Sequence, residues 1–185
     1  MTRFGYVMVT VVAAQLFAVL FVAVALLDPN PRLVWNPSAS APIGLYRIAP
    51  EDDPPVGALV AVTPPERLAR WLSARAYLPE GVPLLKHVAA KAGQRACRIG
   101  DVVSVDARPV AVALARDGQG RPLPTWQGCR TLAPDEMLLL NTAVPGSMDG
   151  RYFGPLPASA VLGRAIPILT RDTPDAPLTW RGIGA

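Results

Sequence analysis

The sequence predicts a mostly β domain that follows one N-terminal transmembrane helix. The 185 residues include 21 prolines and 15 glycines, and only one segment beyond the apolar N-terminus has the spacing of an amphipathic helix. Proline and glycine interrupt helices and favour short strands separated by turns. A chain of this length suits one modest domain together with an anchor.

An apolar run without any charge extends over residues 6–27. At 1.5 Å per residue it is roughly 33 Å long, enough to cross a hydrocarbon core of about 30 Å. The run is longer than the apolar part of a cleaved signal peptide, although Ala-Val-Ala at residues 23–25 resembles a cleavage site. We expect a retained anchor behind a short tail, residues 1–5, with a removed signal peptide as the alternative.

Positive charge is supplied almost entirely by arginine. The chain has 16 Arg and 2 Lys, and its net charge is +4. The basic residues are scattered, which predicts no nucleic-acid partner and a mild attraction to the lipid of the membrane. Because an arginine cannot lose its proton in a protein, Lys86 and Lys91 are the candidates for a deprotonated amine.

The body of the chain is expected to consist mainly of strands. Residues 28–32 (DPNPR) end the anchor, and Ser/Pro-rich residues lead into an apolar strand that ends near residue 48. One short amphipathic helix is expected over residues 64–77. The other expected elements are strands at 57–63, 84–90, 137–140 and 160–169, a hairpin over 101–115 with its turn near Arg108 and Pro109, and a turn at 117–120.

A serine-containing loop is the first candidate for chemistry. Small residues flank Ser38 and Ser40, so a substrate backbone can approach both hydroxyls closely. Pro42 restricts Ala41 to extended conformations, which gives Ser40 a defined local path. The alternative interpretation is an ordinary surface loop.

Lys86 lies inside an apolar strand and is the second candidate. Burial disfavours the ammonium and lowers the pKa of a lysine from about 10.4 toward neutrality, so that it can accept a proton from a serine hydroxyl. The alternative is a lysine whose head group reaches water. His87, the only histidine, should point to the opposite face of the strand and lie outside the site of Lys86.

The third candidate segment covers residues 146–155. Ser147, Asp149 and Arg151 alternate, so they should lie on one side of an extended stretch. Asp149 and Arg151 are placed to form an ion pair. Taken alone, such a pair in a loop contributes only about 0–1 kcal/mol to stability.

The order of these segments behind a single span resembles the type I signal peptidase family, and most of all its conjugative-transfer branch, the TraF-type peptidases. Their S-x-P-x-G-x-Y motif is matched by Ser40, Pro42, Gly44 and Tyr46. General signal peptidases place the serine three residues before the proline, where this chain has Ala39. The resemblance implies a signal-peptidase-like two-subdomain β fold over residues 28–170, with a β insertion at about 97–130 and a C-terminal tail at 171–185.

The resemblance also implies roles for individual residues. Ser40 corresponds to the nucleophile, Lys86 to its general base, and Ser147 to the residue that orients the lysine. The remaining implied roles are an oxyanion hole formed by the Ser38 hydroxyl and the Ser40 N–H, and a supporting ion pair of Asp149 and Arg151. An Asp beside Lys86 would raise the pKa of the lysine, so we expect Asp149 to turn toward Arg151.

Two cysteines fit no metal pattern. In an oxidising compartment Cys97 and Cys129 can form a disulfide, and two buried free thiols are the alternative. The resemblance places them at the ends of the β insertion. It implies neither a metal nor another cofactor.

The implied function is a serine endopeptidase in the bacterial inner membrane with its catalytic domain in the periplasm. Its implied partner is a small hydrophobic exported protein, cleaved after small residues. The resemblance points to a conjugative pilin precursor, whose ends the nearest relatives join into a ring. Two alternatives stay open: a non-catalytic membrane-anchored assembly factor for a pilus or secretion system, and a soluble self-cleaving regulator.

Overall fold

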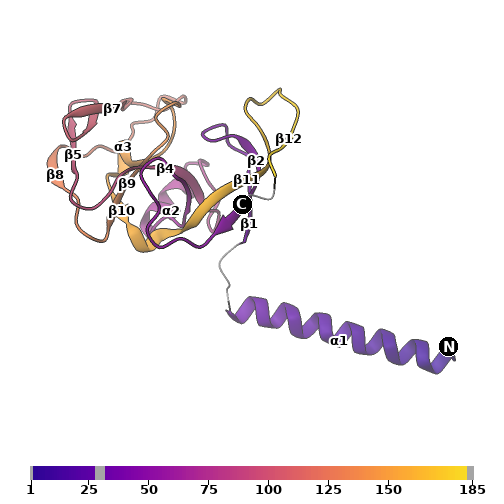
Figure 1. Cartoon of the computed structure of the whole chain (residues 1–185). Coiled ribbons are helices and arrows are strands. Elements are labelled where there is room, and N and C mark those ends of the chain that lie inside the picture. The colour runs from indigo at the N-terminus through magenta and orange to yellow at the C-terminus, as the bar shows by residue number, and fades with distance from the viewer. Residues whose placement is uncertain (1, 28–31, 183–185) are drawn as a thin grey trace. The chain divides into compact units, whose positions relative to one another are not determined.

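A computed structural model describes residues 2–27 and 32–182, and the chain divides into an N-terminal unit and a body that starts at Arg32 (Figure 1). The N-terminal unit is the helix α1 (Arg3–Leu27), none of whose residues is buried. Its mean hydropathy of 2.6 and its length suffice to cross a membrane. Because α1 already begins at Arg3, most of the expected tail at residues 1–5 is helical. The expected proline-rich exit falls on residues 28–31, outside the described part.

The body is mostly β, as expected. Its helical elements are short: α2 (Glu66–Ala74), α3 (Gly150–Phe153) and the 3-10 turn η1 (Ala158–Ala160). Its strands are β1 (Leu33–Asn36), β2 (Ile43–Ala49), β3 (Leu59–Val62), β4 (Leu84–Ala90), β5 (Arg95–Ile99), β6 (Val102–Val105), β7 (Arg108–Val112), β8 (Gly128–Thr131), β9 (Glu136–Leu140), β10 (Leu156–Pro157), β11 (Val161–Arg171) and β12 (Thr179–Trp180).

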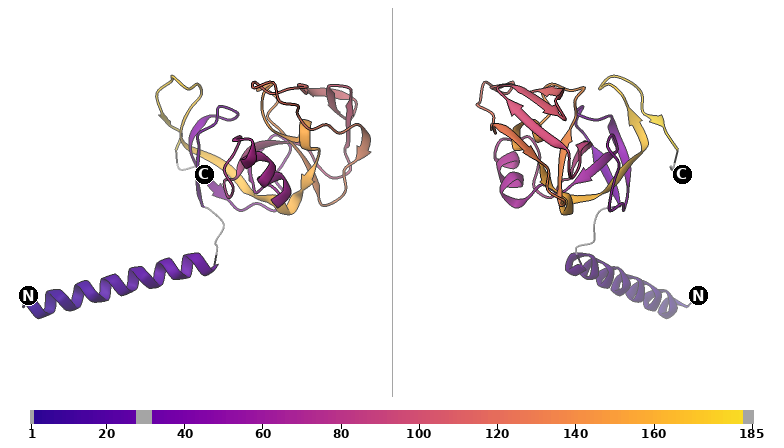
Figure 2. Two further views of the ribbon diagram at one scale, coloured as in Figure 1. Left: turned by 180° about the vertical axis from the view of Figure 1, so that it is seen from behind. Right: turned by 60° about the vertical axis from the view of Figure 1, so that its left-hand side comes forward.

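The strands form two sheets. The larger sheet has the order β1-β2-β11-β3-β4-β9-β10, with β12 paired to β11, and the smaller sheet has the order β7-β6-β5-β8. Figures 1 and 2 show β5, β7 and β8 gathered at one end of the body and β2 and β12 at the other. The two sheets correspond to the two expected subdomains.

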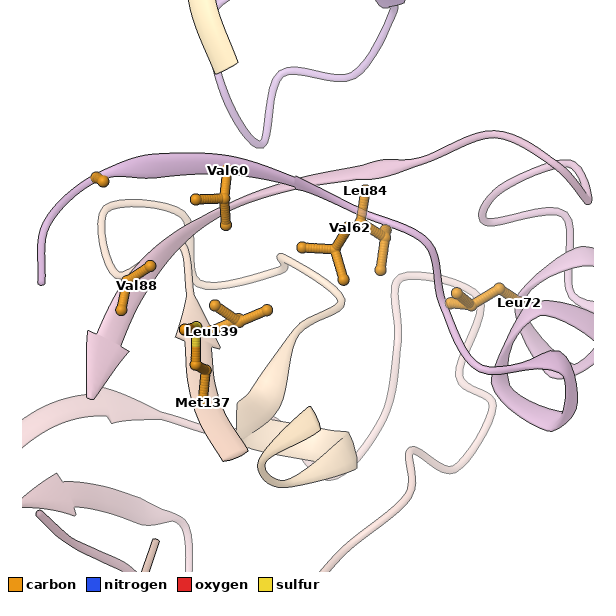
Figure 3. Close-up of a cluster of buried hydrophobic side chains, with 8 residues drawn as sticks. Val60, Val62, Leu72, Leu84, Val88, Met137 and Leu139 are labelled. Carbon is orange, nitrogen blue, oxygen red and sulfur yellow. The ribbon is translucent and has the colours of Figure 1, made fainter. Parts of the chain in front are cut away.

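An apolar core supports the strand that carries Lys86. Val60 and Val62 of β3 pack with Leu84 and Val88 of β4, and Leu139 of β9 lies on the same cluster (Figure 3). All of these side chains are less than a tenth exposed. Because side chains two residues apart in a strand share a face, Lys86 lies on the same face of β4 as Leu84 and Val88, and Leu85 and His87 lie on the other.

Several expected elements are confirmed with small shifts in their bounds. The strand expected at 84–90 is β4, and the helix expected at 64–77 is the shorter α2. The hairpin within 101–115 is formed by β6 and β7, and its turn lies at Asp106 and Ala107, which both have positive φ. Part of the expected tail at 171–185 is ordered, because β12 pairs with β11.

The strands of the smaller sheet, β5 to β8, lie within residues 95–131, close to the stretch 97–130 for which a β insertion is expected. Its strands β5 and β8 pair so that Cys97 lies directly opposite Cys129. The structure joins the two cysteines in a disulfide. Cys129 is exposed on its strand, so the alternative of two buried thiols does not describe this structure.

Candidate active site

The serine loop connects β1 to β2 and is organised by Asn36. The Nδ2 of this buried residue donates to the carbonyls of Ser38, Ala41 and Pro42 at 2.9, 3.1 and 3.1 Å. Its Oδ1 accepts from the Ser38 N–H at 3.1 Å. Asn36 is not among the site residues predicted from the sequence. Its only local signal is an Asn-Pro pair at the end of an apolar strand, which is typical of a turn.

The remaining positions of the serine motif fix the other end of the loop. The hydroxyl of the fully buried Tyr46 donates to the carbonyl of Pro42 at 2.6 Å. Gly44 has a φ of 146°, and a Cβ at this position would lie 2.1 Å from the carbonyl oxygen of Leu169 on β11. Only glycine allows this close approach of two strands. The motif therefore holds the loop rigidly beside β11.

Ser38 and Ser40 are hydrogen-bonded to each other. The Ser38 hydroxyl donates to Ser40 Oγ at 3.0 Å, and the Ser40 N–H donates to Ser38 Oγ at 3.2 Å. Both donors with the implied oxyanion-hole role are thus occupied in the free protein, each by the hydroxyl oxygen of the other serine. The hydrogen of the Ser40 hydroxyl is not used in either bond, so this hydroxyl can still donate to a base.

Lys86 is buried on β4, and its Nζ donates to Ser147 Oγ at 2.8 Å. Burial lowers the pKa of Lys86 from 10.5 to about 8; Asp149 acts in the raising direction and Arg151 in the lowering direction. Desolvation dominates because the ammonium has lost its water. About a tenth of Lys86 is therefore a neutral amine at pH 7, and about half at pH 8.

Asp149 and Arg151 form a buried ion pair, with Arg151 Nε 2.8 Å from Asp149 Oδ1. The prediction of an extended stretch is wrong here, because Gly150–Phe153 form the short helix α3. Asp149 caps that helix by accepting from the Arg151 N–H at 3.1 Å. An Asp carboxylate satisfies the free N–H groups at the start of a helix, which explains the local fold.

Two further buried residues tie this segment to its surroundings, and neither was predicted. Asn141 directly follows β9: its N–H donates to Asp149 Oδ2 at 2.9 Å, and its Nδ2 donates to the Leu85 carbonyl at 3.0 Å. Arg98 of β5 donates to the Arg151 carbonyl at 2.6 Å. The bonds to Leu85 and Arg151 join residues more than 50 positions apart, so no local pattern reveals them.

One cavity of about 350 Å³ brings the candidate side chains together. Ser38, Ser40, Lys86 and Ser147 all line it, with apolar walls from residues such as Leu72. We call it the lysine cavity. His87 does not line it, as the strand alternation predicts. Within residues 2–27 and 32–182 no hydrogen bond joins Ser40 to Lys86; the lysine is held by Ser147 and the serine by Ser38.

The sequence that forms this site matches a known protein family. The signal peptidase family, peptidase S26, matches residues 3–170, which is nearly the whole chain. The chain belongs to the signal peptidase family. The match includes the apolar helix, the serine loop, the lysine strand and the Asp149–Arg151 segment.

The chain is also similar to several proteins named for conjugal or plasmid transfer. It is 44% identical over 146 residues to a probable conjugal transfer protein TraF of Sinorhizobium fredii, covering 73% of this chain and 76% of that protein. It is 37% identical over 149 residues to the conjugal transfer protein TraF of Agrobacterium fabrum, covering 74% and 82%. A plasmid transfer protein TraF of Escherichia coli is 32% identical over 147 residues, covering 73% and 81%.

Among solved structures, a signal peptidase I from Enterococcus faecalis resembles the chain with a TM-score of 0.36 and 17% sequence identity. The alignment covers 60% of this chain and 96% of that one.

Proposed function

We propose that this member of the signal peptidase family is a serine endopeptidase that uses Ser40 as nucleophile and Lys86 as general base. The observation that carries the proposal is the burial of Lys86, with its pKa lowered to about 8, in the cavity that also contains Ser40. A buried lysine that contacts a serine in place of a carboxylate is suited to accept a proton.

The proposed reaction begins when Ser40 Oγ attacks the scissile carbonyl and its proton passes to Lys86 Nζ. The oxyanion then accepts hydrogen bonds from the Ser38 hydroxyl and the Ser40 N–H. In the free protein these two donors bond the hydroxyl oxygens of Ser40 and Ser38 instead. Lys86 next gives the proton to the departing amine. Ser147 keeps the lysine Nζ oriented throughout. The buried pair of Asp149 and Arg151 holds the loop just before Ser147, because Arg151 Nη1 donates to the Pro145 carbonyl at 2.9 Å.

The proposed setting is the periplasmic face of the bacterial inner membrane, with α1 as the anchor. The apolar length of α1 supports membrane attachment, and the disulfide between Cys97 and Cys129 supports an oxidising compartment for the body. The TraF relatives act in conjugal transfer, which supports a pilin precursor or a similar small hydrophobic exported protein as substrate, cleaved after small residues.

Co-expression with the small hydrophobic secreted proteins encoded beside the gene tests the proposal. Mass spectrometry of their termini should show processing by the wild-type chain and none by Ser40→Ala or Lys86→Arg. Arginine keeps the positive charge but cannot act as a base. His87→Ala is the control and should leave cleavage intact. Normal processing by Lys86→Arg overturns the dyad, and normal function of Ser40→Ala in mating favours the non-catalytic assembly factor.

A further inference from the structure

One wall of the lysine cavity comes from the end of α2 and the turn that follows it. Leu72, Tyr77 and Leu78 all line the cavity. Tyr77 is the only aromatic residue among the described residues that line it. A shift of this large ring would therefore change the width of the cavity that contains Ser40 and Lys86.

A tight turn at the end of α2 brings Tyr77 to the cavity. Ala76 has a φ of 57°, and the N–H groups of Ala76 and Tyr77 donate to the carbonyls of Ser73 and Leu72, each at 2.9 Å. Two such bonds around a left-handed residue form a Schellman motif, in which glycine is the usual residue at the left-handed position. Alanine is strained in this conformation and keeps it only where surrounding contacts hold the chain. Contacts from outside the helix therefore help to hold this turn, and with it Tyr77.

Those contacts come from the connection between β7 and β8, whose residues 115–123 we call the arm. The arm is a small hairpin in which the Asp117 N–H donates to the Arg121 carbonyl at 3.0 Å. Its turn is the one expected at residues 117–120. The arm extends from the smaller sheet, whereas α2 connects two strands of the larger sheet, β3 and β4. Contacts between the arm and α2 therefore join the two subdomains.

Asp117 connects the arm to the cavity wall. Its Oδ2 accepts from the Tyr77 hydroxyl, and also from Arg121 Nε at 2.7 Å. Its Oδ1 accepts from the N–H groups of Gln119 and Arg121 at 2.9 and 2.8 Å, which fixes the turn of the arm. The Asp117 side chain is only 5% exposed, so water competes little for these bonds. A well-ordered carboxylate thus holds the hydroxyl of Tyr77.

A second set of contacts holds the arm on the end of α2. Both terminal nitrogens of Arg121 donate to the Arg75 carbonyl at 3.2 Å, and Arg75 Nη1 donates to the Pro122 carbonyl at 2.8 Å. The Arg75 guanidinium lies 4.6 Å from the centroid of the Trp71 ring. That ring stacks on Tyr77, with their centroids 5.5 Å apart. Tyr77 is therefore held through its ring by α2 and through its hydroxyl by the arm.

We propose that Tyr77 is a specificity-determining residue and that Asp117 of the arm is its positioning residue. This inference rests on the proposed serine-protease function and concerns the substrate side chain that enters the lysine cavity next to the cleaved bond. A larger side chain has to push the Tyr77 ring away from the cavity, and this movement breaks the bond to Asp117. The bond therefore makes the cavity discriminate against larger side chains.

Substrate preference measures the role of the Tyr77 ring. The full-length protein in detergent micelles is given the precursor identified by co-expression, in two versions with alanine or leucine immediately before the cleaved bond, and kcat/KM is measured for each. Tyr77→Ala should raise the leucine-to-alanine ratio of kcat/KM by about tenfold or more. This is the size of the discrimination that a methylene group undergoes in an apolar pocket, about 10–200-fold.

A matched control separates a role in specificity from a role in packing. Leu68 of α2 packs against the same apolar core cluster as Tyr77 but does not line the lysine cavity. Leu68→Ala should therefore lower the free energy of unfolding in urea and leave the leucine-to-alanine ratio unchanged.

Two further variants test the arm while keeping the aromatic ring. Tyr77→Phe removes the hydroxyl, and Asp117→Asn removes the acceptor Oδ2 while Oδ1 can still accept from the turn. Each should raise the same ratio by about threefold to tenfold, the net size of one hydrogen bond. The double variant should show no further increase, because both substitutions remove the same bond.

The outcomes separate this inference from the proposed function. An unchanged ratio in Tyr77→Ala, or an equal change in Leu68→Ala, overturns the role of Tyr77 and leaves the Ser40–Lys86 protease standing. If circular dichroism shows that Tyr77→Ala is unfolded, the ratio in Tyr77→Phe decides in its place. Additive effects of Tyr77→Phe and Asp117→Asn overturn the role of Asp117. A wild-type protein that cleaves both precursors equally well overturns the specificity, and one that cleaves neither overturns the protease as well.

Discussion

Lys86 Nζ donates to Ser147 Oγ at 2.8 Å across 61 residues of sequence, and both side chains are almost completely buried. This hydrogen bond holds the amine in the cavity of Ser40 without supplying a negative charge. The carboxylate nearby, Asp149, is engaged by Arg151 and by the Asn141 N–H instead. The arrangement keeps the lysine oriented while burial lowers its pKa.

The pH dependence of cleavage should report the protonation of Lys86. Its pKa of about 8 lies below the ordinary value, and only the neutral amine accepts a proton. We therefore expect kcat/KM to fall about tenfold for each pH unit below about 8 and to level off above it. Initial rates between pH 6 and pH 9 check this; a rate independent of pH over that range contradicts the neutral-amine base.

Replacing Lys86 with methionine should abolish cleavage and increase stability. The folded state lowers the pKa of Lys86 from 10.5 to about 8, so the unfolded state binds more protons between these values. The wild-type penalty is complete below about pH 8, reaches at most about 3 kcal/mol, and disappears as the pH rises toward 10.5. Urea unfolding of wild type and Lys86→Met at pH 7 and pH 10 measures this difference.

The control for the stability of Lys86→Met is the same substitution at the other lysine. Lys91→Met removes a lysine whose side chain is partly exposed and paired with Asp53, so it should not increase stability at pH 7. Equal effects of the two substitutions would show that burial of Lys86 is not the cause.

The hydroxyl of Ser38 should matter for the chemical step more than for binding. It bonds Ser40 in the free protein and is placed to bond the oxyanion in the proposed transition state. Loss of one such donor typically lowers kcat by about 10²–10³. We expect Ser38→Ala to show this decrease with little change in KM, measured by steady-state kinetics. A change confined to KM would assign Ser38 to substrate binding.

The pair of Asp149 and Arg151 should be important for stability, in contrast to a pair at the surface. Both side chains are buried, and Asp149→Asn leaves the Arg151 charge without its partner. Breaking a buried pair in this way costs about 3–5 kcal/mol. The matched control is Asp172→Asn, which breaks the exposed pair with Arg181 and should cost at most about 1 kcal/mol. Urea unfolding followed by tryptophan fluorescence distinguishes them.

Local patterns in the sequence determined much of this protein. Unbroken apolar character over residues 6–27 predicted α1, and alternation placed Lys86 and His87 on opposite faces of β4. The spacing of Ser40, Pro42, Gly44 and Tyr46 pointed to the family. Each of these signals depends on a few neighbouring residues, because helix and strand periodicity is a local property of the chain.

Only the tertiary structure decided how the segments meet. The pairing of β3 and β9 with β4 sets which residues reach Lys86 and His87, and a shift by one residue would exchange the two faces. The contacts of Asn141, which follows β9, with Leu85 and His87 of β4 depend on that register. Such contacts join residues far apart in sequence, and their energies depend on burial, which a linear pattern does not contain.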